Sequence, residues 1–140
     1  MQVPGDALRI EAELAFQEAK NDWSLYNLLL AHHYTFLMQV SQSAACNGLH
    51  PVVKRCCRWL LMTHDRIEGD ELPLTHEFLS YMLGVRRPGV TEALQALECQ
   101  GLIDNGRGAI RIVDRKGLEA ASCECYRIVA KEYARLLGAE

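Results

Sequence analysis

Arg86 and Arg87 are adjacent guanidinium side chains at the expected start of a helix. A shorter helix is expected before them, because Thr75 can cap its first turn and Gly84 can take the left-handed conformation that ends it. A tight turn of this kind holds the second helix across the first and leaves its first turn exposed. Guanidinium groups placed there can enter a major groove about 12 Å wide. The apolar positions that would bury the two helices are Phe78, Leu79 and Met82 in the first and Val90, Ala93, Leu94 and Leu97 in the second.

Two short runs of β-type residues follow, from Gly101 to Asn105 and from Ala109 to Val113, joined by Gly106-Arg107-Gly108. A glycine-rich turn between two such runs indicates a β-hairpin. Its tip would offer backbone N–H groups and the guanidinium of Arg107 to a phosphate. A hairpin directly after the second helix predicts a winged helix-turn-helix.

A metal or redox site is the main alternative chemistry, because the chain has six cysteines and five histidines. Ligand pairs on one helix need a spacing of three or four residues, whereas Cys56 and Cys57 diverge by about 100° and Cys123 and Cys125 by about 200°. Small buried residues explain most of these thiols, so we expect neither a metal nor a cofactor. The side chains considered are Cys46, Cys56, Cys57, Cys99, Cys123 and Cys125, with His32, His33 and His50.

We also expect that the chain is not an enzyme. His76 and Glu77 are neighbours on one expected helix and point apart, and no serine or cysteine stands in a nucleophile motif. The glycine-rich segment 106–108 is too short for a nucleotide-binding loop.

Charge is unevenly distributed along the 140 residues, which carry a net charge of −3. Residues 1–50 hold two basic and five acidic side chains, whereas residues 51–140 hold 13 of each. Because nonspecific affinity for DNA comes from lysine and arginine, any DNA contact must be local and lie in the second part. No apolar run approaches the roughly 20 residues of a membrane span, and residues 1–20 lack the pattern of a signal peptide. A cytoplasmic protein with free thiols is expected.

A long helix is expected from Trp23 to Ala45, where neither proline nor glycine occurs. Its apolar stripe suits pairing with a second helix, as in a dimer, although packing within the same chain is the alternative. Asn47-Gly48 is expected to end this helix, with Gly48 as a candidate hinge. The predicted dimer contacts are Leu25, Leu29, His32, Phe36 and Val40.

Three further elements are expected around the two-helix unit. A helix from Pro51 to about His64 would bury its apolar side and turn Lys54, Arg55 and Arg58 outward. Residues 66–71 are predicted to form a polar loop. A single last helix is expected after Asp114, which can cap it.

The chain resembles the C-terminal part of bacterial Crp/Fnr regulators. The resemblance rests on Leu74-Thr75, Gly84-Val85-Arg86-Arg87, Leu97-Glu98 and Gly101-Leu102-Ile103, together with the long helix; Asp114-Arg115 to Cys125-Tyr126 is similar to the tail of one large subgroup. It implies a mainly α fold with a small β-hairpin, in which residues 1–50 form a sensor remnant and dimerisation helix and residues 51–140 form the winged helix-turn-helix. Residues 3–10 resemble the last strand of the family's sensor barrel, so most of that barrel and its ligand pocket are not expected here.

The resemblance also assigns contacts to DNA. Thr75 would bond a phosphate, Arg86 and Gly89 would lie along the backbone, and Arg87 would read guanine. Pro88 and Glu92 depart from the branch that responds to cyclic AMP, so that branch's target sequence does not transfer. Glu92 would either accept a hydrogen bond from cytosine or stay solvated. The full predicted set is Thr75, Arg86, Arg87, Pro88, Gly89, Thr91, Glu92 and Arg107.

The resulting hypothesis is a dimeric transcription regulator that binds an inverted-repeat operator in double-stranded DNA, with RNA polymerase as a further candidate partner and no membrane contact. The alternatives are a winged helix used for protein contact and a truncated partner that pairs with full-length relatives. Whether the chain is a natural short protein or a fragment stays open at this point.

Overall fold

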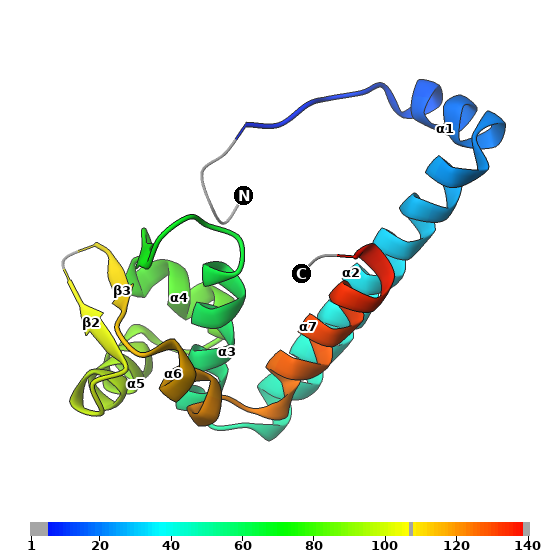
Figure 1. Cartoon of the computed structure of the whole chain (residues 1–140). Helices are drawn as coiled ribbons and strands as arrows, with labels where there is room; N and C mark the ends of the chain where they lie inside the picture. Colours follow the sequence, from blue (N-terminus) through cyan, green and yellow to red (C-terminus); the bar gives the residue numbers. More distant parts are fainter. Residues whose placement is uncertain (1–5, 107, 139–140) are drawn as a thin grey trace.

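The computed structural model describes residues 6–106 and 108–138. These residues form seven helices and a three-stranded antiparallel sheet, so the expected mainly α fold with a small hairpin is confirmed (Figure 1). The predicted wing residue Arg107 and the start of the expected barrel strand, residues 3–5, lie outside the described residues; residues 6–10 form no regular secondary structure. The elements are α1 (Ala12–Asn21), α2 (Trp23–Leu49), α3 (Val52–His64), β1 (Glu71–Leu72), α4 (His76–Leu83), α5 (Arg87–Cys99), β2 (Ile103–Asn105), β3 (Ile110–Ile112), α6 (Arg115–Ala121) and α7 (Glu124–Leu137).

The long helix α2 begins at a capped end and continues past its expected stop. The side chain of Asp22 accepts hydrogen bonds from the backbone N–H groups of Ser24 and Leu25. Gly48 stays helical, and the helix ends at Leu49 because His50 precedes Pro51, which disfavours a helical residue before it. The bend between α2 and α3 therefore lies at His50–Pro51, and the expected helix end at Asn47-Gly48 is wrong by about one turn.

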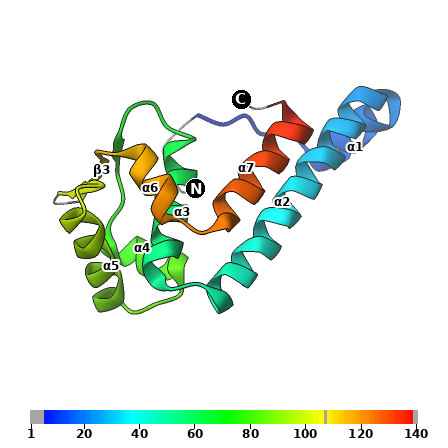
Figure 2. The ribbon, with the colours of Figure 1, turned by 60° about the horizontal axis from the view of Figure 1, so that its bottom comes forward.

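The last helix is two helices, contrary to the expectation of one. Asp114 caps α6 through a 2.9 Å bond from the N–H of Gly117, as predicted. Ser122 and Cys123 then take extended conformations, and the hydroxyl of Ser122 donates to the carbonyl of Glu119. This side-chain bond competes with the helical pattern. The break allows α7 to turn back and pack antiparallel along α2 (Figures 1 and 2).

Helices α3 to α6 and the sheet enclose one apolar core, to which α7 adds Tyr126 and Val129 (Figure 2). The strand order is β1-β3-β2, with Ile103 opposite Ile112 and Leu72 opposite Ile110. Strand β1 lies at the end of the segment that was expected to be a polar loop. Its two residues are too few to show the alternation of apolar and polar side chains that predicts a strand. The core is formed mainly by Leu60, Leu61, Leu72, Leu79, Leu83, Val90, Leu94, Leu97, Ile110 and Leu118.

Two arginines of α3 are buried, although they were expected to face outward. Arg55 is 7% exposed and Arg58 is 0% exposed, whereas Lys54 is exposed as predicted. Arg55 donates to the backbone carbonyls of Asn47 and Leu83. These bonds fasten α3 to the end of α2 and to α4, which explains why Arg55 occupies the interior.

Candidate nucleic-acid interface

The helix pair α4–α5 has the local geometry that the sequence predicted. The hydroxyl of Thr75 accepts a 3.1 Å bond from the N–H of Phe78 and caps α4. Gly84 ends α4 at φ 61° and ψ 39°, a left-handed conformation that glycine adopts without steric cost. After this turn Arg86 occupies the N-cap position of α5 without a side-chain capping bond, and Pro88 lies in the first turn, where a missing N–H is tolerated.

Arg86 and Arg87 are exposed at the start of α5. Within the described residues, neither guanidinium has a hydrogen-bond or ion-pair partner. The two positive charges are therefore free to meet an external anion. Gly89 is half-buried, and a Cβ built there would meet nothing within 4 Å.

Of the other residues predicted to contact DNA, some are exposed and one is already hydrogen-bonded within the protein. Thr75 and Glu92 are exposed; the hydroxyl of Thr75 accepts the capping bond and keeps its own hydrogen for a phosphate. Thr91 is half-buried, and its hydroxyl donates to the carbonyl of Arg87 at 3.2 Å. His76 Nδ1 lies 3.1 Å from the same hydroxyl. Thr91 is thus held within the protein on two sides.

His76 joins the three parts of the unit, a role that sequence reasoning missed. Its Nδ1 contacts Thr91 of α5, and its Nε2 lies 3.1 Å from Oδ1 of Asn105 in β2. The backbone N–H of Asn105 also donates to Glu98 Oε1 at 3.1 Å. These bonds set the wing against α5. A separation of 15 and 29 residues between the partners leaves no sequence pattern for them.

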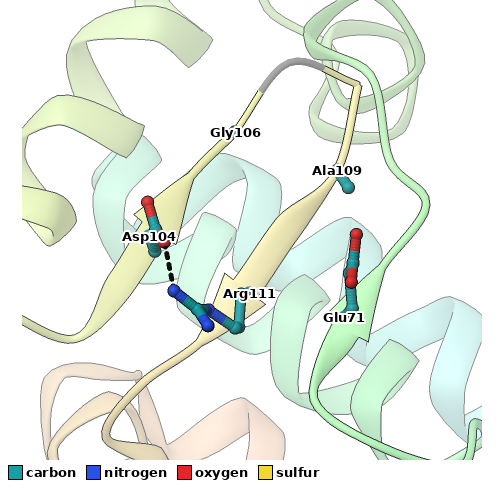
Figure 3. Close-up of a pocket in the computed structure, with 5 residues that line it drawn as sticks. All are labelled: Glu71, Asp104, Gly106, Ala109 and Arg111. Carbon is teal, nitrogen blue, oxygen red and sulfur yellow. Dashed lines mark hydrogen bonds and ion pairs between the residues drawn. The ribbon is translucent and has the colours of Figure 1, made fainter.

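The wing has one arginine whose charge is already paired. Arg111 of β3 forms an ion pair with Asp104 of β2 across a shallow pocket (Figure 3). Glu71 of β1 lines the same pocket, so acidic side chains flank the guanidinium. Among the described wing residues, Gly106 and Gly108 are exposed, and Gly108 has φ 84°.

The thiols do not extend this surface. Burial raises the pKa of Cys56 and of Cys57 to about 12, so both stay protonated and poorly nucleophilic at neutral pH. Cys99 is exposed at the end of α5, and the remaining three lie where α2 meets α7. None of the helices in the described ranges combines the length and hydropathy of a membrane span.

Comparison with known proteins finds a family match in the central part of the chain. Residues 54–121 match the Crp-like helix-turn-helix domain. FixK2 from Bradyrhizobium japonicum has a TM-score of 0.73 and 20% identity over 81% of this chain and 60% of its own. A protein from Eubacterium rectale, described as a putative Crp/Fnr transcriptional regulator, has a TM-score of 0.60 and 27% identity. The match covers 79% of this chain and 51% of that protein. TTHB099 from Thermus thermophilus, a regulator of the CRP family, has a TM-score of 0.54 and 22% identity. The match covers 61% of this chain and 47% of that protein.

The chain covers less than two thirds of each of these solved structures. No curated protein matches its sequence.

Proposed function

We propose that the chain is a sequence-specific, DNA-binding transcription regulator without catalytic activity, because residues 54–121 match the Crp-like helix-turn-helix domain. The observation that carries the proposal is the exposure of Arg86 and Arg87, without partners among the described residues, at the start of α5. Guanine presents two acceptors in the major groove, and a guanidinium can bind both. Arg87 reads guanine in this arrangement, while Arg86 and Thr75 contact phosphates.

The wing contacts the phosphate backbone beside the groove. Backbone N–H groups near Gly106 and Gly108 suit a phosphate, and Arg107 adds a charge at the tip. The bonds from His76 to Thr91 and Asn105 hold the wing at a fixed place relative to α5. A groove contact and a backbone contact are thus made by one rigid unit.

The chain acts as a homodimer through α2. Helix α7 covers one side of α2, where Thr35 and Cys46 are buried. The uncovered side is apolar: Leu29 is 47% exposed, Phe36 52% and Val40 48%, while His32 is exposed and Leu25 half-buried. Apolar side chains in such numbers on one helix mark an interaction surface. Other large exposed side chains on α2 are Trp23, Tyr26, Leu28, Leu30, Tyr34 and Leu37.

A second copy is the partner that suits this surface, because a twofold axis would present two α5 helices to one duplex. Recognition helices in such dimers enter the major groove about 34 Å apart, one turn of DNA. The operator is therefore an inverted repeat. A cytoplasmic location and a contact with RNA polymerase follow from this role.

Selection of bound sequences from random duplexes at stated salt tests the proposal. We expect enrichment of an inverted repeat that contains guanine in each half-site. A protein that binds no duplex at low ionic strength would contradict the proposal and favour a winged helix used for protein contact. A chain that binds DNA only when mixed with a longer relative would instead support the heterodimer alternative.

A further inference from the structure

Four side chains with metal-binding atoms gather where α2 ends and α7 begins. Cys46 and His50 lie one turn apart at the end of α2, and Cys123 and Cys125 flank the first residue of α7. Their three sulfur atoms and one imidazole nitrogen lie within 4.8 Å of one another. The antiparallel packing of α7 on α2 brings these two pairs together from distant parts of the chain (Figure 1).

Two of the distances between these atoms are close to those of a tetrahedral zinc site. Cys46 Sγ lies 3.6 Å from Cys123 Sγ, and Cys125 Sγ lies 3.6 Å from His50 Nδ1. With Zn–S bonds of about 2.3 Å and Zn–N bonds of about 2.0 to 2.1 Å, tetrahedral geometry separates two sulfurs by about 3.8 Å and sulfur from nitrogen by about 3.5 Å. Little movement would be needed to bind one ion.

Neighbouring polar groups orient two of the four ligands. His50 Nε2 lies 3.3 Å from the carboxylate of Glu124, while its Nδ1 faces the thiols. Metal-binding histidines usually donate their second N–H to such a carboxylate, which fixes the ring and its tautomer. The amide of Gln42 donates to Cys125 Sγ at 3.1 Å. The contacts of Glu124 with His50 and of Gln42 with Cys125 are therefore present without a bound ion.

The buried charge of Arg58 is a second, independent indication. Its guanidinium is fully buried and has no carboxylate partner among the described residues, and its Nε and Nη2 have no hydrogen bond there. It donates at 3.0 Å to Ser43, one turn before Cys46 on α2. A buried cation without a counter-ion is costly. Three thiolates and one Zn²⁺ carry a net charge of −1, which would compensate it.

We propose that Cys46, His50, Cys123 and Cys125 bind one Zn²⁺ ion in a closed, structural site. Four protein ligands leave no position for a reacting water, which is the arrangement of structural zinc. An iron–sulfur cluster spreads its ligands over more than one iron, whereas these four atoms lie around a single point. The expectation of no metal rested on spacing within single helices and did not consider the Cys46–His50 pair, whose spacing of four suits a shared ion.

The ion fastens α2 to α7 at the end of this helix pair that adjoins the helix-turn-helix domain. Its ligands lie next to both connections to that domain, the bend at His50–Pro51 and the break between α6 and α7. Binding releases the thiol protons and makes the α2–α7 contact dependent on metal.

Zinc analysis of the full chain tests the proposal. Protein purified under reducing conditions should contain one zinc ion per chain, as measured by inductively coupled plasma mass spectrometry. Cobalt added to the stripped protein should produce thiolate charge-transfer bands and the visible bands of a tetrahedral ion. The Cys125→Ser variant should lose most of the bound zinc, whereas Cys99→Ser, which alters the exposed cysteine of α5, should retain it.

A milder variant covers the case in which a buried substitution prevents folding. Glu124 is exposed, so Glu124→Gln should fold normally and weaken zinc binding by about 10- to 100-fold in chelator competition. The matched change Glu68→Gln, in an exposed loop, should leave affinity unchanged. Wild-type protein that binds no zinc or cobalt when reduced, or equal affinity in all variants, would overturn the proposal. A Cys46–Cys123 disulfide in protein that binds no metal after reduction would do the same and indicate a redox pair.

Discussion

The two arginines of α5 have different expected roles because they stand on either side of the helix start. Arg87 belongs to the first turn of α5, whereas Arg86 is the capping residue before it. A first-turn side chain reaches into the groove, and a capping residue lies nearer the strand backbone. Specificity should therefore depend on Arg87 and general affinity on Arg86.

Arg87→Ala should weaken binding to the selected operator by about 1 to 3 kcal/mol and have little effect on a scrambled duplex. The loss arises because the two acceptors of one guanine lose their partner. Fluorescence anisotropy on both duplexes at one salt concentration measures it. Arg127→Ala removes an exposed arginine of α7 and should change neither affinity. Equal losses on both duplexes for Arg87→Ala would make Arg87 a phosphate contact.

His76 contributes at the same scale by joining α4, α5 and β2. His76→Ala should lower the free energy of unfolding by about 1 to 2 kcal/mol, because two half-buried hydrogen bonds to Thr91 and Asn105 are lost. Urea denaturation checks this value. Gln95→Ala, an exposed change on α5, is the matched control and should cost little. A stability equal to that of the wild type would mean that the three contacts do not hold the wing.

At the scale of elements, α7 covers one face of α2 and leaves an apolar face exposed. Phe36→Asp places a charge on the uncovered face and should give monomers, because an ion cannot be buried between two apolar helices without a large desolvation cost. Light scattering at micromolar concentration distinguishes the two states. Gln95→Asp adds the same charge on α5 and should leave the dimer intact. A wild-type protein that is itself monomeric at this concentration would remove the argument for pairing.

A polar network joins the ends of α3, α6 and α7. Arg115 donates to Asp65 at 2.7 Å and to the hydroxyl of Tyr126 at 2.8 Å, and that hydroxyl donates to Asp65 at 3.2 Å. Burial, reinforced by the carboxylate of Asp65, raises the pKa of Tyr126 to about 12, above the value of about 10 in an unfolded chain. Folding therefore favours the protonated phenol, and its contribution is complete below pH 10 and is lost as pH rises toward 12.

Tyr126→Phe should remove this part of the alkaline loss of stability. The wild type should lose more of its free energy of unfolding between pH 10 and pH 12 than the variant does, since only the wild type ionises at this position. Chemical denaturation at several pH values measures both curves. Parallel curves over that range would show that Tyr126 is not perturbed by folding.

The elements that sequence patterns predicted are those with local signals. Capping by Thr75, the left-handed Gly84 and the glycine-rich hairpin each depend on a few adjacent residues, and all three were correct. The errors concern contacts between distant segments. Arg55 and Arg58 look like an exposed stripe until α2 and α4 cover them, and the four metal-ligating side chains meet only after α7 folds back on α2. The sequence likewise contains no pattern that predicts the contact between the Thr91 hydroxyl and His76.

At the scale of the whole molecule, a protein with a net charge of −3 must bind a polyanion through a small region. Acidic residues outweigh basic ones in the first 50 residues, so the proposed contact surface on α5 and the wing lies in the part of the chain where the two charges balance. A dimer doubles each phosphate contact, because the twofold axis repeats every side chain in both half-sites.

Salt dependence measures this doubling directly. Each phosphate contact contributes about 0.9 to the slope of log affinity against log salt concentration. Arg86→Ala should therefore reduce that slope by about 2 in a dimer, for the operator and for scrambled DNA alike, whereas Arg127→Ala should leave it unchanged. Titration at four or more salt concentrations gives the slope. A reduction near 1 would mean that only one half-site is contacted, and no reduction would place Arg86 away from the phosphates.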